Sequence, residues 1–260
     1  PLNWIKVGRQ IAKARPDIIL VRFSIPFMGP VLGTILRLVR KNKHTRIIGL
    51  ADNIIPHEKR PGDKPFTKYF LGSCDAFITM SEKVMSDLRS IEKSKPAQLV
   101  AHPLYDNFGA AIAKDVAREK LGIDKKDKVI LFFGFIRKYK GLDILLEAMA
   151  DARIKEAGIK LLVAGEFYED EKVYQEQIDR LGIRSQLIMR TQFIPDSEVV
   201  LYFCAADVVI QPYRNATQSG VTPLAYHYEK PMIVTNVGGL PAMVPDRKSG
   251  LVAAVQPMAI

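Results

Sequence analysis

Short apolar runs alternate with amphipathic stretches along most of the chain. Residues 1–104 contain four apolar runs that are rich in β-formers and bounded by turn residues: PDIILVRF, TRIIGLAD, CDAFITM and PAQLVAHP. Segments with helical period lie between them, among them MGPVLGTILRLVRKN and SEKVMSDLRSIEK. This alternation of strands and helices is typical of an α/β fold. Ser81, directly after CDAFITM, is predicted to cap the next helix.

The alternation restarts after residue 104 and continues along the chain. Helical and apolar segments follow one another in this order: AKDVAREKLGI, KVILFFGF, GLDILLEAMADARIK, IKLLVAG, DEKVYQEQIDRLG, SQLIMRTQF, DSEVVLYFCAA (capped by Asp196 or Ser197) and DVVIQPY. Strands this apolar are covered on both faces, which predicts a parallel sheet wrapped by helices. The sequence therefore predicts two Rossmann-like, doubly wound domains. We place the boundary within residues 103–112 and assign residues 1–106 to the first domain and residues 107–260 to the second.

Hydropathy and cysteine usage narrow the class of protein. No apolar run reaches the roughly 18 residues of a membrane span. Cys74 and Cys204 both lie inside apolar segments, which favours buried thiols in a reducing, cytoplasmic compartment over a disulfide or a metal site. The opening PLNWIKVGRQ has the wrong polarity for a signal peptide and reads as the interior of a longer protein, so we expect the first domain to be incomplete.

The net charge of +10 is unevenly distributed. Residues 1–110 hold 18 Lys and Arg against 9 Asp and Glu, whereas residues 111–260 hold 20 against 19. A basic first domain is compatible with anionic lipid, nucleic acid or an acidic acceptor as partner, and equally with an ordinary solvated surface. No aromatic-interleaved basic motif and no zinc spacing supports nucleic acid, so we expect no nucleic-acid partner.

The loop after KVILFF combines glycines with cations. Gly134 follows the strand, the next helix is predicted to begin at Gly141, and Arg137 and Lys140 stand between them. Ligands of doubly wound sheets bind outside the carboxyl ends of the strands, and a helix N-terminus favours an anion. The loop therefore predicts a phosphate site, with a basic solvated turn as the alternative.

A second loop of this kind lies in the stretch QPYRNATQSGVTPLAYHYEKPMIVTNVGG. A helix of about three turns is predicted to begin near Ser219, Gly220, Val221 and Thr222, because the following proline is tolerated only in a helix's first turn. Gly220 allows a close approach to the backbone, and the hydroxyls of Thr217, Ser219 and Thr222 can cap or donate. Two such loops on one edge of one sheet suggest a diphosphate that bridges them.

Four ordered segments carry a family resemblance: GFIRKYKGLDILLEAM, LLVAGEF, FIPDSEVVLYFCAADVVIQPY and SGVTPLAYHYEKPMIVTNVGGLPAMVPDRKSGLV. In order and spacing they resemble the nucleotide-sugar domain of family 4 retaining glycosyltransferases, over about residues 128–255. This family has the GT-B architecture, in which two Rossmann-like domains face each other across a cleft. Residues 1–104 resemble, less specifically, the back half of its acceptor domain.

The resemblance implies roles for individual residues. Arg137 and Lys140 correspond to the pair that neutralises the donor diphosphate and its departing charge, so that neither a metal nor a cofactor is required. Gly220, Val221 and Thr222 correspond to the opposite backbone cradle. The nucleotide base is expected at Phe193 and Ile194, for which ordinary strand-end packing is the alternative.

The sequence also departs from the family pattern. Many members carry two glutamates separated by seven residues, and an ungapped fit places Ala216 and Leu224 at those positions. A histidine that often follows the second strand of the acceptor domain is replaced by Asp52, while His57 lies further along the same loop. We expect His57 either to act in the cleft or to be a solvated loop residue. We expect His227 to be structural, in the middle of a buried helix.

We therefore expect a retaining glycosyltransferase that moves a sugar from a nucleotide-diphosphate sugar to a saccharide or lipid-linked acceptor. The alternative is a non-catalytic nucleotide-sugar-binding subunit of the same fold. A nicotinamide-dependent enzyme is disfavoured because GxGxxG is absent from the sequence.

The resemblance also bears on the location of the protein. Family members that build cell-surface polysaccharide or glycolipid commonly act on lipid-linked acceptors at the inner face of the membrane. Five cations follow an apolar helical stretch and fit peripheral attachment there: Arg37, Arg40, Lys41, Lys43 and Arg46. The alternative is that ILRLV packs on the sheet and the cations are solvated.

Overall fold

The computed structural model describes the whole chain except residues 1, 57–59, 102, 104–105 and 218. The chain divides into two compact units, residues 1–102 and 103–260, whereas the sequence placed the boundary after residue 106. Each unit is built around its own parallel sheet. His57, expected to act in the cleft or to be a solvated loop residue, lies outside the described residues.

Unit 1 contains a four-stranded sheet of order β1-β2-β3-β4. Its elements are α1 (Leu2–Ala14), β1 (Ile18–Phe23), the 3-10 turn η1 (Pro26–Met28), α2 (Gly29–Arg40), β2 (Arg46–Ala51), α3 (Asp63–Leu71), β3 (Ala76–Thr79), α4 (Glu82–Ile91) and β4 (Ala97–Leu99). As predicted, the side chain of Ser81 accepts a hydrogen bond from Val84 N and caps α4. The stretch PAQLVAHP forms only the three residues of β4.

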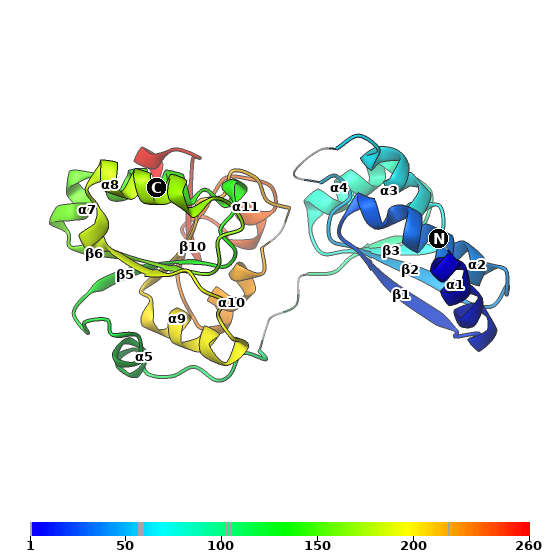
Figure 1. Ribbon diagram of the computed structural model, residues 1–260, viewed down its shortest axis with the longest axis horizontal. Helices are drawn as coiled ribbons and strands as arrows, with labels where there is room; N and C mark the ends of the chain where they lie inside the picture. Colours follow the sequence, from blue (N-terminus) through cyan, green and yellow to red (C-terminus); the bar gives the residue numbers. More distant parts are fainter. Residues whose placement is uncertain (1, 57–59, 102, 104–105, 218) are drawn as a thin grey trace. The chain divides into compact units, whose positions relative to one another are not determined.

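The helices of unit 1 cover one face of its sheet. Figure 1 shows α2, α3 and α4 along one side of the strands, with α1 against α2. The core on this face includes Phe23, Ile47 and Phe77. The opposite face carries Ile18 and Leu20 of β1, which are 61% and 58% exposed. A parallel sheet is ordinarily covered on both faces, so this exposed apolar face is unusual.

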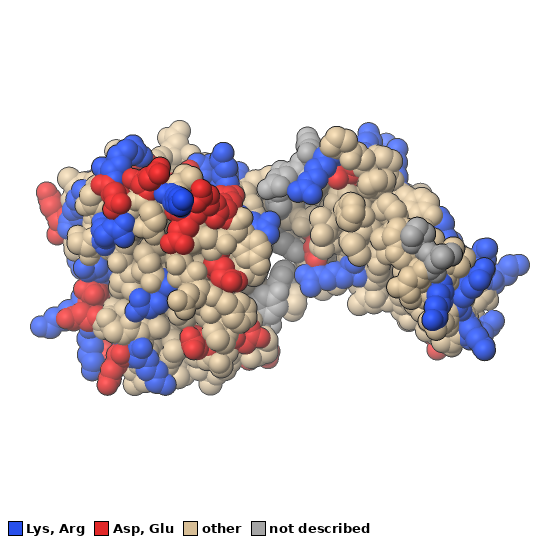
Figure 2. Space-filling model, in the orientation of Figure 1, with Lys and Arg blue, Asp and Glu red and all other residues tan. Residues whose placement is uncertain are grey.

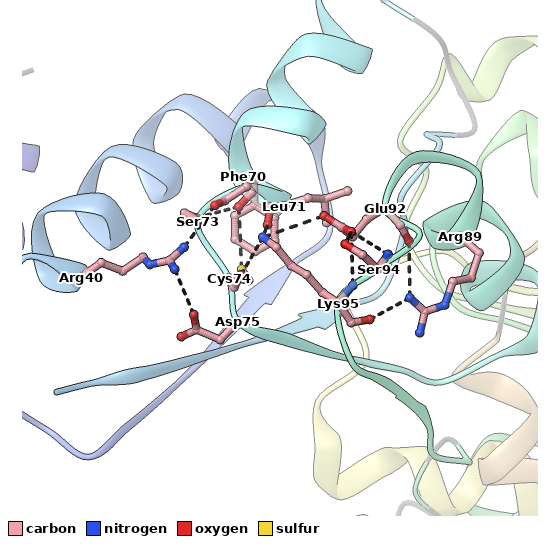
Figure 3. A network of polar contacts seen from close by, with 11 residues as sticks. Arg40, Phe70, Leu71, Ser73, Cys74, Asp75, Arg89, Glu92, Ser94 and Lys95 are labelled. Carbon is pink, nitrogen blue, oxygen red and sulfur yellow. Dashed lines mark hydrogen bonds and ion pairs between the residues drawn. The ribbon is translucent and has the colours of Figure 1, made fainter. Parts of the chain in front are cut away.

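A polar network closes the end of the sheet in unit 1 where β3 begins (Figure 3). The ammonium of Lys95 donates to the carbonyl oxygens of Leu71 and Cys74, each at 2.7 Å. Arg40, at the end of α2, pairs with Asp75 at 3.2 Å. Burial raises the pKa of the Cys74 thiol to about 12. The network ties α2, α3 and β4 to the start of β3.

Unit 2 contains a six-stranded parallel sheet of order β10-β9-β8-β5-β6-β7. Its elements are α5 (Lys114–Leu121), β5 (Lys128–Phe133), η2 (Lys138–Lys140), α6 (Leu142–Met149), α7 (Ala152–Glu156), β6 (Ile159–Ala164), α8 (Glu171–Leu181), η3 (Arg184–Gln186), β7 (Leu187–Arg190), η4 (Asp196–Glu198), α9 (Val199–Ala205), β8 (Val208–Gln211), α10 (Val221–His227), β9 (Met232–Thr235), α11 (Leu240–Met243), β10 (Gly250–Ala253) and η5 (Pro257–Ala259).

Helices cover both faces of this sheet, as its apolar strands predict (Figure 1). One core contains side chains of α5, α9 and α10, and the other contains side chains of α6 and α8. Cys204 is buried in the first of these cores, and both cysteines are free, as predicted.

Some predicted element boundaries in unit 2 are wrong. The single helix predicted for GLDILLEAMADARIK is two helices, because Asp151 leaves the helical path and its side chain caps α7 by accepting from Arg153 N. The predicted side-chain cap at Asp196 or Ser197 is replaced by the turn η4, and α9 begins at Val199 without a side-chain cap.

The helix predicted after the second loop is shorter than expected. α10 has seven residues instead of about three turns. His227 is its last residue and is half-buried, so the prediction of a histidine in the middle of a buried helix is wrong. Its ring nitrogen lies 3.4 Å from the carbonyl oxygen of Gly109.

Candidate functional site

The order of the strands reverses between β5 and β8. β5 pairs with β6 on one side and with β8 on the other, so the chain winds outward in both directions from this pair. In doubly wound sheets, ligands bind outside the carboxyl ends of the strands at such a switch point. Gly134 directly follows β5, and residues 212–214 directly follow β8. The candidate site therefore lies between these two loops, within unit 2.

Gly134 brings the two predicted loops together. Its φ of +99° is a backbone conformation that residues with a side chain rarely adopt. A Cβ built on it would lie 2.8 Å from Nζ of Lys140 and 3.9 Å from Cγ2 of Val221, the first residue of α10. The absent side chain leaves room beside the lysine ammonium. The glycine loop and the start of α10 are thus neighbours at one edge of the sheet.

Lys140 and Arg137 supply positive charge at this edge. Among the described residues, neither forms an ion pair with an acidic side chain. Desolvation by burial lowers the pKa of Lys140, and the charge of Arg137 adds to the lowering. The ammonium of Lys140 lies 5.6 Å from the ring centroid of Tyr213. The guanidinium of the exposed Arg137 lies 4.8 Å from the ring centroid of Tyr168. Two uncompensated cations make the edge suited to an anion.

The hydroxyls of the second loop are used within the protein. Ser219 Oγ accepts from Val221 N at 3.2 Å, and Gly220 is the N-cap residue of α10. The buried hydroxyl of Thr222 exchanges hydrogen bonds with the side-chain amide of Gln211, at 3.1 and 3.2 Å. These contacts fix the start of α10. They also show that the hydroxyl of Thr222, predicted to cap or donate, has Gln211 as its partner.

The turn that carries Lys140 is bound by residues that the sequence did not single out. Arg214, which follows β8, contacts this turn and forms an ion pair with Asp143 of α6. Glu169 accepts a hydrogen bond from Lys138 N at 2.6 Å. The sequence offered one signal for Arg214, namely its position as a charged residue at the carboxyl end of the predicted strand DVVIQPY.

Phe193 and Ile194 follow a different strand from the other predicted residues. They follow β7, the edge strand, which is separated from β5 by β6. Phe193 is 67% exposed, and Ile194 is half-buried against the core. The structure brings together Gly134, Lys140 and Val221, and Phe193 follows a strand two positions away in the same sheet.

The positions of the missing acidic pair are packed. Ala216 and Leu224 are only 2% and 5% exposed. A Cβ on Gly238 would lie 1.4 Å from the carbonyl oxygen of Ala216, so the backbone at Gly238 closely covers this segment. In unit 1, Asp52 directly follows β2 and is buried, and its Oδ2 accepts from Arg22 Nε at 2.5 Å.

The comparisons with known proteins agree with this fold. The sequence profile described as "Glycosyl transferases group 1" matches residues 113–259, which include the whole candidate site. The chain belongs to this glycosyltransferase family.

Relatives and solved structures extend the likeness. The D-inositol 3-phosphate glycosyltransferase of Corynebacterium urealyticum is 35% identical over 190 residues, covering 69% of this chain and 45% of that protein. The enzyme of the same name from Segniliparus rotundus is 34% identical over 142 residues, covering 53% of this chain and 31% of that protein. The chain thus spans less than half the length of these relatives.

Among solved structures, Anabaena HepE in complex with UDP and glucose has a TM-score of 0.81 at 15% identity and covers 97% of this chain and 68% of that one. Sucrose-phosphate synthase from Thermosynechococcus elongatus has a TM-score of 0.76 at 18% identity. The match covers 92% of this chain and 62% of that one. These neighbours confirm the predicted α/β class with Rossmann-like parallel sheets, the GT-B fold. No helix among the described residues is long and apolar enough to span a membrane.

Proposed function

We propose that the chain is part of a retaining glycosyltransferase whose unit 2 binds a nucleotide-diphosphate sugar as donor. One observation carries the proposal: Gly134 leaves space beside the ammonium of Lys140 at the switch point of the sheet, with Arg137 adding a second cation. Two structural neighbours, Anabaena HepE in complex with UDP and in complex with UDP-glucose, support this class of donor.

The proposed mechanism uses the two cations at the leaving group. Charge develops on the diphosphate as its bond to the sugar breaks, and Lys140 and Arg137 are placed to stabilise that charge without a metal or a cofactor. Backbone amides at Gly220 and Thr222 add hydrogen bonds from the opposite side, whereas the amide of Val221 already donates to Ser219 Oγ and helps to hold this segment in place. In a retaining reaction the leaving oxygen accepts the acceptor's proton on the same face. NMR of the product's anomeric proton tests this, and inversion of configuration contradicts it.

Unit 1 is proposed to be the later part of the acceptor-binding domain. The exposed apolar face formed by Ile18 and Leu20 supports the expectation that this domain is incomplete in the sequence. The acceptor is a saccharide or a lipid-linked saccharide of cell-surface polysaccharide or glycolipid biosynthesis, at the cytoplasmic face of a membrane. His57 is proposed to act in the cleft, with a solvated loop residue as the alternative.

A donor panel tests the proposal. UDP, GDP and ADP sugars are added to the protein, and the melting temperature and the hydrolysis of each donor are measured. We expect at least one donor to stabilise the protein and Arg137→Ala with Lys140→Ala to abolish the shift. Each single substitution should weaken binding by about 1.5–3 kcal/mol, as for a hydrogen bond to a charged group. An unchanged shift in the double variant contradicts the assignment.

A non-catalytic nucleotide-sugar-binding subunit remains the second candidate. The burial of Ala216 and Leu224, where many relatives carry acidic residues, favours it. Such a subunit binds the donor with the same dependence on Lys140 but neither hydrolyses nor transfers it. Measuring binding and turnover on the same preparation separates the two functions.

A further inference from the structure

Lys140 lies in a turn with few hydrogen bonds of its own. Within η2 and its flanks, Lys140 N donates to Arg137 O at 2.8 Å and Gly141 N donates to Lys138 O at 3.2 Å. A 3-10 turn of three residues has weak intrinsic stability, because its hydrogen bonds are poorly aligned and few. Contacts from other segments must therefore fix the position of the Lys140 ammonium.

Arg214 provides the largest set of these contacts. Its backbone N–H donates to the carbonyl oxygen of Tyr139 at 2.7 Å, and its Nη1 donates to that of Lys138 at 3.2 Å. Its two terminal nitrogens also bind the two carboxylate oxygens of Asp143 at 2.5 and 2.6 Å. A bidentate pair of this kind holds the planar guanidinium in one orientation. Arg214 thus joins two carbonyls of the turn to helix α6.

Neighbouring residues complete the attachment. Pro212 lies so close that a Cβ on Gly141 would be 2.0 Å from its carbonyl oxygen. The ring of Tyr213 lies beneath the Lys140 ammonium, at 5.6 Å from its centroid. Three successive residues after β8 therefore contact the turn after β5, and Glu169 holds Lys138 N from the side of β6. The loops of three adjacent strands meet at this turn.

We propose that Arg214, oriented by Asp143, is a positioning residue that fixes the ammonium of Lys140 in the anion site. The inference rests on the proposed function in that the anion is the diphosphate of a nucleotide sugar. Arg214 acts through the turn and is not required to touch the ligand. A turn that is already ordered loses less conformational freedom when the diphosphate binds, so the affinity for the donor is higher.

The test compares nucleotide binding in variants of the whole chain. Dissociation constants for UDP, GDP and ADP are measured by calorimetry for the wild type, Lys140→Ala, Arg214→Met and Asp143→Asn. We expect Arg214→Met to raise the dissociation constant of the preferred nucleotide about tenfold, and Asp143→Asn to raise it in the same direction by less. Arg214→Lys keeps the positive charge but lacks the planar guanidinium that binds both carboxylate oxygens of Asp143. It should therefore restore only part of the nucleotide affinity.

Arg180→Met is the matched control. Arg180 pairs with Glu147 on the same helix α6, at 2.6 Å, and does not contact the turn. This variant removes an Arg–carboxylate pair on α6 that is formed by a single N···O contact and lies outside the turn. We expect it to bind the nucleotide with wild-type affinity, so a general effect of losing an ion pair on α6 is excluded.

A second readout reports on the turn without any nucleotide. The rate of acetylation of Lys140 is followed by mass spectrometry as a function of pH, which gives its apparent pKa. Burial lowers this pKa in the wild type. If Arg214 holds the turn in place, Arg214→Met exposes the ammonium to water and its pKa rises toward the ordinary lysine value.

Each outcome has a defined meaning. If the wild type binds a nucleotide and Lys140→Ala does not, but Arg214→Met binds and titrates like the wild type, the positioning role is wrong. If the wild type binds none of the three nucleotides, the proposed function fails, and the titration of Lys140 still decides whether Arg214 positions it. A folded Arg214→Met with weakened binding and a raised Lys140 pKa supports the inference.

Discussion

A Cβ on Gly134 would lie 2.8 Å from the ammonium nitrogen of Lys140. This short distance shows that the glycine and the lysine occupy the same small space at the end of β5. Gly165 reinforces the constraint, because a Cβ there would lie 2.4 Å from the carbonyl oxygen of Gly134. Gly165 therefore leaves no room for the backbone of Gly134 to move toward β6, and a side chain on Gly134 must displace Lys140.

Gly134→Ala should therefore weaken donor binding more than it weakens the fold. The positive φ of Gly134 makes alanine unfavourable by about 1–2 kcal/mol, and displacement of the ammonium lowers nucleotide affinity in addition. Gly158→Ala is the matched control, because Gly158 has a φ of +65° and nothing lies within 4 Å of a Cβ there. Thermal denaturation and calorimetry check both variants. Equal nucleotide affinity in the two variants contradicts the prediction.

Nucleotide binding should weaken as pH rises. Only protonated Lys140 attracts the diphosphate, and burial lowers its pKa, so it loses its proton at a lower pH than an ordinary lysine. In the free protein the same lowered pKa makes folding more favourable as pH rises. The reason is that Lys140 binds its proton more strongly in the unfolded chain than in the folded one. Lys140 should therefore make affinity fall while stability rises over one pH range. Lys140→Arg, which stays charged, should flatten the affinity profile measured by calorimetry.

The contact between Arg118 and Asp207 should make unit 2 sensitive to acid. Arg118 Nη2 lies 2.9 Å from Asp207 Oδ2, which also accepts from Val129 N at 2.8 Å. Desolvation raises the pKa of Asp207, but the hydrogen bonds from Lys114 and Val129 and the charge of Arg118 outweigh it, and the pKa is lowered. A lowered pKa stabilises the fold above the ordinary aspartate range, and this stability is lost as pH falls through the lowered value.

Asp207→Asn should accordingly destabilise unit 2 near neutral pH and reduce the loss of stability in acid. The expected cost is roughly 2–4 kcal/mol, because the guanidinium of Arg118 is buried and loses its charged partner. Denaturant titrations at neutral and acidic pH measure both effects. Arg184→Met, which removes an exposed pair with Asp179, should change stability by less than about 1 kcal/mol. Identical acid sensitivity in wild type and Asp207→Asn excludes this role of Asp207.

Lys95 should be a stabilising contact of unit 1. Its ammonium donates to the carbonyl oxygens of Leu71, the last residue of α3, and of Cys74, which lies between α3 and β3 (Figure 3). Lys95→Met retains the aliphatic stem but leaves both carbonyls without this donor, for an expected loss of about 1–3 kcal/mol. Lys93→Met, an exposed lysine two residues earlier, is the control and should be neutral. Hydrogen exchange of unit 1 measures the difference, and equal protection in both variants contradicts the prediction.

The sequence predicted the layers of unit 2 because its strands are apolar along their whole length. KVILFF and IKLLVA pair over their full length as β5 and β6, and the glycine and lysine of the following loop lie where such strands place a ligand. These features depend on local pattern and on a general rule of parallel sheets. The location of Gly134 and Lys140 was therefore predictable.

The order of the strands was not predictable from the same pattern. Phe193 follows an apolar strand like the others, but that strand is at the sheet edge, two positions from β5. Arg214 and Asp143 pair across 71 residues of sequence, and only the adjacency of β8 and β5 brings them together. Hydrophobic periodicity carries no information about which strands are neighbours.

The exposed cations of unit 1 should bind anionic membranes. Figure 2 shows Lys and Arg gathered over the part of unit 1 that carries α1 and α2. Leu36 and Val39 of α2 are buried in the core, which favours packing of this stretch over its insertion into lipid. Arg37 stacks on the ring of Tyr69 at 3.7 Å. Attachment should therefore be electrostatic and should depend on exposed lysines.

Liposome flotation tests this with a charge-reversal variant of Lys13, Lys41 and Lys43, all changed to Glu. We leave Arg40 unchanged because it pairs with Asp75 in the polar network at the start of β3. Wild-type protein should float with vesicles that contain anionic lipid and should dissociate as salt rises, since exposed charges are screened within about 8 Å at physiological ionic strength. The matched control reverses Lys120, Lys126 and Lys155, which are exposed lysines of unit 2. Two outcomes contradict membrane binding by this surface: equal flotation of the unit 1 variant and the unit 2 control, or equal flotation of the wild type with neutral and anionic vesicles. In either case the basic surface serves another partner, and a soluble saccharide becomes the better candidate for the acceptor.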